Sequence, residues 1–298
     1  MVTRTLERAP AGPSSPTTWP AAAMPPLFVV LWSSAFIAGI IGVDAAPPLL
    51  LIVTRFVLAG LLLAGVAVAL RMPWPRGRAL GHVAVTGVLI QAVQFGALYC
   101  ALGMGMPAGV VALVQGFSPV LVALASAPAL GERVSRRRWA GFALGAAGVV
   151  VAVSDRVAFS AAAVPLAIAG LAGLSAGTVY QKRYASDMHL ITGTAVQFLV
   201  AAPLVAAASL AFETPQVAHW GSFGAAIAWM VLVNSVGCFL LLNLMLRRSS
   251  ASRVSTLFFL TPSVTALMAW LIVGQSLSVA ALAGLALGGA GVLLASRS

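Results

Sequence analysis

The chain alternates between long apolar runs and short polar connections, as expected of a protein that crosses a membrane many times. An α-helix rises about 1.5 Å per residue, so about twenty apolar residues cross the roughly 30 Å of hydrocarbon in a bilayer. Residues 1–23 are rich in proline, serine and threonine, and we expect a disordered tail there instead of a signal peptide. Ten apolar runs follow and are predicted to be spanning helices: 24–43, 49–70, 80–102, 107–130, 138–154, 161–181, 190–211, 223–246, 251–273 and 277–296.

The second half of the chain repeats the first at a constant offset of 143 residues. The clearest copy places Ser118–Val153 over Thr261–Ser296 without gaps, which indicates a helix-turn-helix unit built twice. Each half holds five predicted helices, an odd number, so the second half enters the membrane from the opposite side. The sequence therefore predicts an all-α integral membrane protein with ten transmembrane helices in two inverted five-helix repeats, 24–154 and 161–296. Inverted repeats of this kind are typical of secondary transporters.

Basic residues fall in every second connection, and this pattern predicts the orientation of the chain. Short loops rich in arginine and lysine lie on the cytoplasmic side of a membrane. All but two of the 17 basic residues lie in the tail, in alternate connections or at the carboxyl end. The exceptions are Arg156, in the other set of connections, and Arg55, inside the second predicted helix. We therefore expect both termini in the cytoplasm.

Composition independently favours a membrane protein. Apolar residues make up 61% of the chain and charged residues 8%, whereas an average soluble domain has about 25% charged residues. The net charge of +11 is split among short clusters and forms no continuous basic face, so the lipid bilayer is an expected partner and nucleic acid is not. Cys100 and Cys238 lie inside apolar runs without ligand spacing, so no metal, disulfide or cofactor is predicted.

Several motifs resemble a known transporter family. They are LWSSAFIAG at 31–39, TRFVLAGLLL at 54–63, and two copies of a Pro, Gly-Glu/Gln and Gly-x-x-Leu-Gly-x-x-Gly pattern. Together they resemble paired EamA domains of the drug/metabolite transporter superfamily over nearly the whole chain, from about residue 24 to 296. Within that family the chain most resembles the YddG-type aromatic amino-acid exporters of bacterial inner membranes. The resemblance implies the fold and an export activity, but its motifs say little about the substrate.

Two amides at equivalent positions are the first candidates for a substrate site. Gln91 in the third predicted helix pairs by the offset with Asn234 in the eighth, and a site between inverted repeats draws on both halves. An uncompensated amide in hydrocarbon costs several kcal/mol, so each must face a cavity or a partner. Gln94 and Tyr99 flank Gln91 on the helical wheel, while Asn243 lies about 180° from Asn234 and cannot share its face. The competing interpretation is that these amides only hold helices together.

Aromatic residues and prolines complete the predicted cavity. Trp32 lies mid-span in the first helix and pairs by the offset with the small residue Ser175, which leaves room between the halves; packing alone is the alternative. The fourth and ninth helices are expected to bend at proline and to line the cavity. For the hydroxyls beside the prolines, hydrogen bonds to freed carbonyls are favoured over substrate contact. The residues assigned to these two helices are Gln115, Ser118 and Pro119, and Phe258, Thr261 and Pro262.

The small-residue faces of the fifth and tenth helices and the charge of Arg55 are interpreted separately from the substrate site. Paired small-residue faces predict that the fifth and tenth helices pack together away from the cavity, with homodimerisation through the same faces as the alternative. Whether the chain is a monomer or a homodimer stays open. Arg55 lies near the start of its helix, so we expect its side chain to extend to the interface, although an intramembrane charge is also a functional candidate. The residues of the small-residue faces are Gly141, Gly145, Gly284 and Gly288.

These features favour an exporter of neutral small metabolites, with aromatic or hydrophobic amino acids as the leading class, working by alternating access. No aspartate or glutamate lies mid-span, so no carboxylate proton relay is visible, and neither transport direction nor ion coupling is encoded. Export of other small metabolites or drugs is the alternative. Nucleotide-sugar exchange would need more cavity cations, and a lipid flippase would need a laterally open cavity. No nucleophile, acid-base pair or metal cluster within the spans suggests an enzyme.

Overall fold

The structure is a computed structural model that describes residues 23–106, 108–131, 134–153, 163–273 and 279–296, and all regular elements in these ranges are helices. Some helices follow one another directly and form one continuous segment; η1 is π-helical. In the first repeat the elements are α1 (Met24–Ala45), α2 (Pro48–Ala69), α3 (Gly77–Thr86), η1 (Gly87–Phe95), α4 (Gly96–Gly103), α5 (Ala108–Gly116), α6 (Ser118–Leu130) and α7 (Arg136–Val153).

The second repeat follows the same plan. Here η3 is π-helical and η4 is a 3₁₀-helix. Its elements are α8 (Val164–Tyr184), α9 (Leu190–Phe212), α10 (Trp220–Trp229), η3 (Met230–Cys238), α11 (Phe239–Arg248), α12 (Ala251–Ser255), η4 (Thr256–Leu260), α13 (Thr261–Val273) and α14 (Val279–Ser296).

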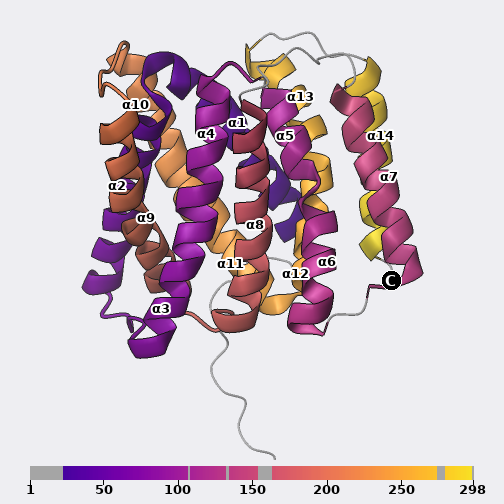
Figure 1. Ribbon diagram of the computed structural model, residues 1–298, viewed down its shortest axis with the longest axis horizontal. Coiled ribbons are helices and arrows are strands. Elements are labelled where there is room, and N and C mark those ends of the chain that lie inside the picture. Colours follow the sequence, from indigo (N-terminus) through magenta and orange to yellow (C-terminus); the bar gives the residue numbers. More distant parts are fainter. Residues whose placement is uncertain (1–22, 107, 132–133, 154–162, 274–278, 297–298) are drawn as a thin grey trace, which may run out of the picture.

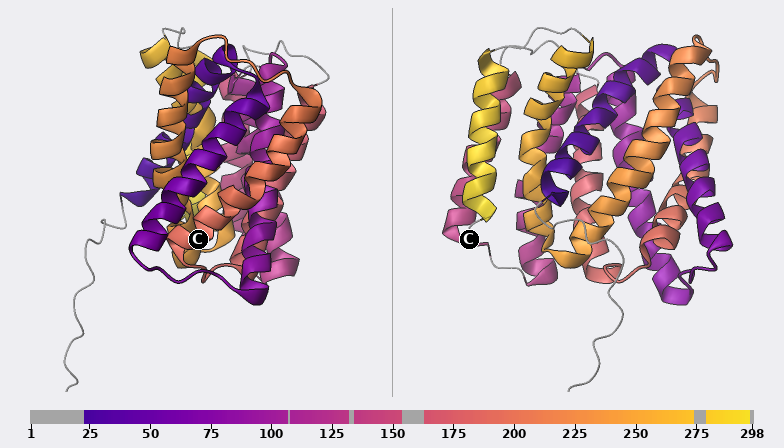
Figure 2. Two further views of the ribbon diagram at one scale, coloured as in Figure 1. Left: turned by 90° about the vertical axis from the view of Figure 1, so that its left-hand side faces the viewer. Right: turned by 180° about the vertical axis from the view of Figure 1, so that it is seen from behind.

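Within the described residues these elements form ten helical segments, one for each predicted run. They lie side by side in a bundle, and the start of α1 and the end of α14 lie toward the same end of it (Figures 1 and 2). Seven segments are long and apolar enough to cross a membrane. The prediction of an all-helical membrane protein is therefore confirmed.

The two repeats meet through equivalent helices. α2 packs along α9, and α7 packs along α14, which lie together at one side of the bundle (Figure 1). A Cβ atom on Gly148 would lie 2.6 Å from the backbone nitrogen of Gly288 and 2.9 Å from the carbonyl oxygen of Gly284. A Cβ on Gly141 would lie 2.8 Å from the carbonyl oxygen of Gly291. Small residues thus bring the α7 and α14 backbones together, while Gly145 makes room for a neighbouring aromatic ring, that of Phe259.

Both repeats interrupt their third helix in the same way. η1 and η3 are π-helical over nine residues each, and the offset of 143 superimposes them end to end. Within an apolar run the hydrophobic pattern does not distinguish this geometry from an α-helix, so neither segment was predicted. Such π-helical turns are rare and occur frequently at functional sites. They contain Gln91 and Asn234, respectively.

Proline interrupts the fourth helix of each repeat at equivalent positions. α5 ends at Gly116 and α6 begins at Ser118, with Pro119 in its first turn, and 3₁₀-helical η4 precedes Pro262 in α13. A proline cannot donate to the preceding turn, so the regular helix ends before it. The expected break in both helices is present.

Candidate functional site

An aromatic cluster fills the centre of the bundle, with Trp32 of α1 in its middle. The indole lies against four phenylalanine rings, with centroid distances of 4.9 Å to Phe258, 5.4 Å to Phe28, 5.7 Å to Phe239 and 6.1 Å to Phe95. Phe28 and Phe95 come from the first repeat, and Phe239 and Phe258 from the second. The cluster therefore lies at the seam between the repeats, and the contacts are tilted or edge-to-face, as aromatic pairs prefer.

Arg55 of α2 is buried beside this cluster, which corrects the expectation that it reaches the interface. Its side chain is 0% exposed. The guanidinium Nε donates to Ser235 Oγ of η3 at 2.8 Å, and Cζ lies 4.5 Å from the centroid of the Phe95 ring of η1. These contacts turn the side chain into the bundle, so Arg55 connects the two π-helical segments across the seam.

The positive charge of Arg55 has no acidic partner among the described residues. The described acidic residues are Asp44, Asp187 and Glu213. They lie at the ends of helices or just beyond them, and none is near the middle of a span. The terminal nitrogens Nη1 and Nη2 are buried and have no hydrogen-bond partner. An unpaired buried charge is destabilising, and charges inside membrane spans usually have a functional role.

Three glutamine side chains share this lack of partners. Gln91 and Gln94 of η1 and Gln115 of α5 are at most 1% exposed, and neither the nitrogen nor the oxygen of any of the three amides has a hydrogen-bond partner. Each unsatisfied buried polar group costs about 1–3 kcal/mol, so η1 and α5 keep such groups only where they have another use. The first repeat thus supplies unpaired donors and acceptors to the interior.

Asn234 differs from its equivalent Gln91. Its Nδ2 atom donates to the carbonyl oxygen of Leu31 at 2.6 Å and to Ser34 Oγ at 3.1 Å, and only Oδ1 lacks a partner. The amide therefore joins η3 to α1. Asn243 instead bonds Gln181 and Thr194, away from Asn234, as its position on the helical wheel predicts.

Gln91, Phe95 and Tyr99 lie on one face of the η1–α4 segment, because residues about four to five apart stack in π-helical geometry. Tyr99 is 1% exposed and its hydroxyl donates to the carbonyl oxygen of Ala35 at 3.2 Å. Gly39 of α1 makes room for this ring, since a Cβ there would lie 3.2 Å from it. Tyr99 also neighbours Arg55. An amide, a ring, a phenol and a guanidinium are thus brought together.

The hydroxyls beside the prolines do not bond the backbone as expected. Ser118 Oγ accepts a hydrogen bond from Ser175 Oγ at 3.3 Å, and Thr261 Oγ1 is buried without a partner. The carbonyl oxygen of Thr261 accepts from Ser33 Oγ of α1, at 3.4 Å. Side chains of the neighbouring α1 and α8 therefore contact the two interruptions.

Equivalent positions carry different chemistry in the two repeats. Arg55 pairs by the offset with Phe198, and Gln115 pairs with Phe258. Phe198 lies 5.6 Å from Phe239 between ring centroids, so it joins the same cluster. At these positions the first repeat places polar groups and the second places rings.

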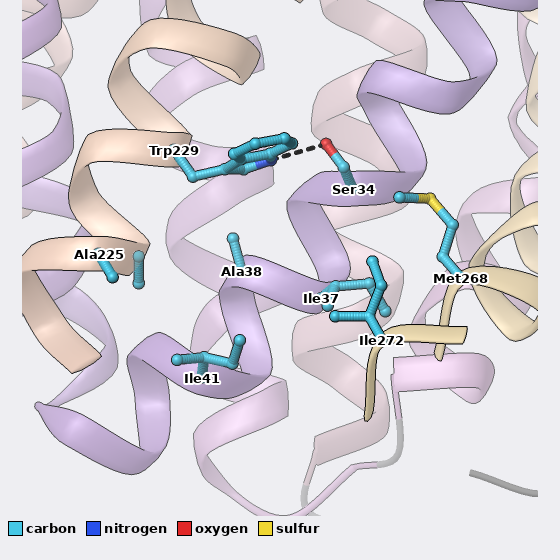
Figure 3. Close-up of a pocket in the computed structure, with 9 residues that line it drawn as sticks. Ser34, Ile37, Ala38, Ile41, Ala225, Trp229, Met268 and Ile272 are labelled. Atoms are coloured by element: carbon cyan, nitrogen blue, oxygen red, sulfur yellow. Dashed lines mark hydrogen bonds between the residues drawn. The ribbon is translucent and has the colours of Figure 1, made fainter. Parts of the chain in front are cut away.

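Two apolar crevices flank α1 outside this buried centre. One, of about 250 Å³, lies between α1, α10 and α13; the Trp229 indole nitrogen donates to Ser34 Oγ at 3.0 Å at its edge (Figure 3). The other, of about 480 Å³, lies between α1, α9 and the η3–α11 segment and is lined by residues such as Leu27, Leu31 and Val233. The site itself is closed, because its members are at most 4% exposed.

The structure thus places the predicted residues Trp32, Tyr99 and Phe258 at the seam and adds Arg55, Phe95, Phe239 and Ser235, while Gln91 is buried on the same helical segment as Phe95. Of the added residues, only Arg55 was recognisable from the sequence, as an intramembrane charge. The phenylalanines could not be distinguished from packing residues. Ser235 is one of many serine and threonine residues in the apolar runs, and no sequence pattern distinguishes it from the others.

The signature of the EamA-like transporter family matches the chain twice, at residues 23–154 and 161–297. The chain is 25% identical over 250 residues to "Uncharacterized inner membrane transporter YedA" of Escherichia coli, covering 84% of this chain and 81% of that protein. It is 31% identical over 286 residues, 91% of each chain, to "Probable terminal-alkyne amino-acid exporter" of Streptantibioticus cattleyicolor.

Two further similarities were found. Over 129 residues, 43% of this chain and 41% of the other, it is 33% identical to "Probable amino-acid metabolite efflux pump" of Escherichia coli. A crystal structure superimposes with a TM-score of 0.76 at 25% sequence identity, covering 92% of this chain and 95% of that chain.

Proposed function

Because the chain belongs to the EamA-like transporter family, we propose that it exports neutral small metabolites, with aromatic and hydrophobic amino acids as the leading class. The observation that carries this proposal is the pairing of unpartnered polar groups with an aromatic cluster at one seam. Amides can bind the polar end of a zwitterion, and the rings around Trp32 can receive an apolar side chain. The names of two similar proteins, a probable terminal-alkyne amino-acid exporter and a probable amino-acid metabolite efflux pump, support the same class.

Transport would proceed by alternating access around the closed site. The proposed substrate-binding residues are those predicted from the sequence: Trp32, Gln91, Gln94, Tyr99, Gln115, Asn234 and Phe258. Since these side chains are buried, helices must move to admit a substrate. The breaks before Pro119 and Pro262 are suitable hinge points, because the regular hydrogen bonding is already interrupted there.

For the cellular setting, we propose the inner membrane of a bacterium with both termini in the cytoplasm. Its support is the distribution of arginine and lysine, together with the start of α1 and the end of α14, which lie toward the same end of the bundle (Figure 2). A reporter that fluoresces only in the cytoplasm, fused after Ser298, is expected to fluoresce. Activity of a reporter that works only outside the cytoplasm would contradict this orientation.

Uptake into proteoliposomes tests the substrate class. Radiolabelled phenylalanine and tryptophan are expected to enter faster than threonine, and Gln91→Ala is expected to slow uptake about 3- to 10-fold, the effect of one hydrogen bond. Gln197→Ala is the matched control, since this buried glutamine bonds Gln181 away from the cluster. Normal uptake by both Gln91→Ala and Asn234→Ala would refute the site, and no flux of any amino acid would refute the class.

A second candidate, movement of a lipid or a hydrophobic drug, is favoured by the two crevices beside α1. Both are lined almost entirely by apolar side chains and lie between helices, so an apolar molecule could enter from the bilayer. Transfer of a fluorescent phospholipid between leaflets of proteoliposomes tests it. Faster transfer than in protein-free liposomes would support this candidate over amino-acid export.

A further inference from the structure

Arg55 has the surroundings of an anion-binding group whose anion is not part of the chain. Its side chain is fully buried where α2 meets η1 and η3. Two of its nitrogens have no hydrogen-bond partner, and none of the described acidic residues lies near the middle of a span. A buried charge needs a partner, and in a membrane span such a residue is a candidate for ligand binding.

Two contacts fix the guanidinium in place. Nε donates to Ser235 Oγ at 2.8 Å, and the group lies over the Phe95 ring with Cζ 4.5 Å from the ring centroid. The hydrogen bond uses Nε and the ring covers one face, so Nη1 and Nη2 remain. These are forked donors of the kind that binds two carboxylate oxygens side by side.

The neighbouring polar groups are uncharged. Gln91, Gln94 and Tyr99 carry amides and a phenol, which can bind an ammonium group or a neutral group but cannot balance a second negative charge. One guanidinium balances one negative charge. A phosphate ester or a dicarboxylate would bring a second negative charge without a second cation beside it, whereas amide and phenol oxygens can accept hydrogen bonds from the ammonium group of a zwitterion.

We propose that Arg55 binds the carboxylate of the transported molecule, so that the substrates are small monocarboxylates, α-amino acids first among them. This rests on the proposed function and names the group that recognises the substrate. The carboxylate lies on the Nη atoms, the ammonium group lies near the glutamine amides, and the side chain lies among the rings around Trp32. A molecule without a carboxylate leaves the guanidinium unpaired and binds weakly.

Binding to the full-length chain in lipid nanodiscs tests the inference without requiring transport. The ligands are L-phenylalanine and phenylacetate, each with a carboxylate, and L-phenylalaninamide and 2-phenylethanol, each without one. The wild type is expected to bind each carboxylate about 10- to 100-fold more tightly than its uncharged or amide counterpart, the range for a charge-assisted hydrogen bond. Equal affinities within the pairs would overturn the inference.

Substitutions locate the effect. Arg55→Gln is expected to remove the preference for carboxylates, and Arg55→Lys to retain only part of it, because an ammonium group has a charge but no planar fork. Arg137→Gln, an exposed arginine at the start of α7, is the matched control and is expected to leave the preference unchanged. Preference retained in a folded Arg55→Gln protein would overturn the assignment.

The outcomes separate this inference from the proposed function. Carboxylate-dependent binding without flux in proteoliposomes would contradict export but support the role of Arg55. Flux of amino acids with equal binding of L-phenylalanine and its amide would support export and overturn the role of Arg55. If Arg55→Gln does not fold, the four ligands on the wild type decide alone.

Discussion

The two π-helical segments occupy equivalent positions, yet their neighbouring helices hold them differently. η1 lies directly on α8, where Gly170, Gly173 and Gly177 face it; a Cβ on Gly173 would lie 2.8 Å from the carbonyl oxygen of Leu89. The start of η1 is equally close to α9, since a Cβ on Gly87 would lie 2.7 Å from the backbone of Gln197. The backbone of η1 therefore packs directly against the backbones of α8 and α9.

Around η3, larger side chains occupy the equivalent positions. The equivalents of the three α8 glycines are Leu27, Val30 and Ser34 of α1. Leu27 and Ser34 line the two crevices, and Val30 is 47% exposed. The equivalent of Gly87 is Met230, a buried side chain instead of a backbone contact. η3 thus meets α1 through side chains, among them the Asn234 amide, and crevices lie beside this contact.

This difference indicates which seam moves. Close backbone contacts between small residues hold helices firmly, whereas side-chain contacts beside a crevice can rearrange at lower cost. We therefore expect the contact between α1 and η3 to open during transport while the contact between α8 and η1 stays closed. α1 carries Trp32, so its movement would open the aromatic cluster.

The largest expected effect comes from filling the closed seam. Gly173→Leu places a side chain where even a Cβ atom meets backbone, so we expect a destabilisation of about 3 kcal/mol or more, seen as a lower thermal midpoint in detergent. Val30→Leu, at the equivalent exposed position, is the control and should change stability by about 0.5 kcal/mol or less. Similar midpoints for both variants would refute the comparison.

An intermediate effect distinguishes the two equivalent amides. Asn234→Leu removes the bonds to Leu31 and Ser34, so we expect a loss of about 1–2 kcal/mol in stability. Gln91→Leu removes an amide without a partner, so the unfolding midpoint should stay the same or rise even though transport is impaired. A larger destabilisation by Gln91→Leu than by Asn234→Leu would contradict this assignment.

The smallest effect is expected at the edge of the crevice in Figure 3. Trp229→Phe removes the bond to Ser34 but keeps an aromatic ring, at a cost of about 0.6 kcal/mol, typical of one hydrogen bond between membrane helices. Looser attachment of α1 should speed uptake or leave it unchanged. A strong loss of uptake with unchanged stability would instead place Trp229 in the substrate site.

The sequence predicts the architecture well and the site in part, for identifiable reasons. Apolar runs and the offset of 143 residues suffice for ten helices and two repeats, because both features recur over the whole chain. Hydrophobicity alone could not show that η1 and η3 are π-helical. The position of Arg55 near the start of α2 suggested the interface, whereas its depth depends on Phe95 and Ser235, which no local pattern connects to it. Likewise, Gln91 and Asn234 are equivalent by the sequence offset. Only the position of α1 in the fold shows that Asn234 is hydrogen-bonded whereas Gln91 has no partner.

The most direct test is the distance between spin labels across each seam, with Cys100 and Cys238 replaced by alanine. One pair, at Val30 and Leu232, spans α1 and η3, and the other, at Ile168 and Val93, spans α8 and η1; all four positions are exposed. Saturating L-phenylalanine is expected to shift or broaden the distances of the first pair and leave those of the second unchanged. Movement of the second pair with a fixed first pair would contradict the account.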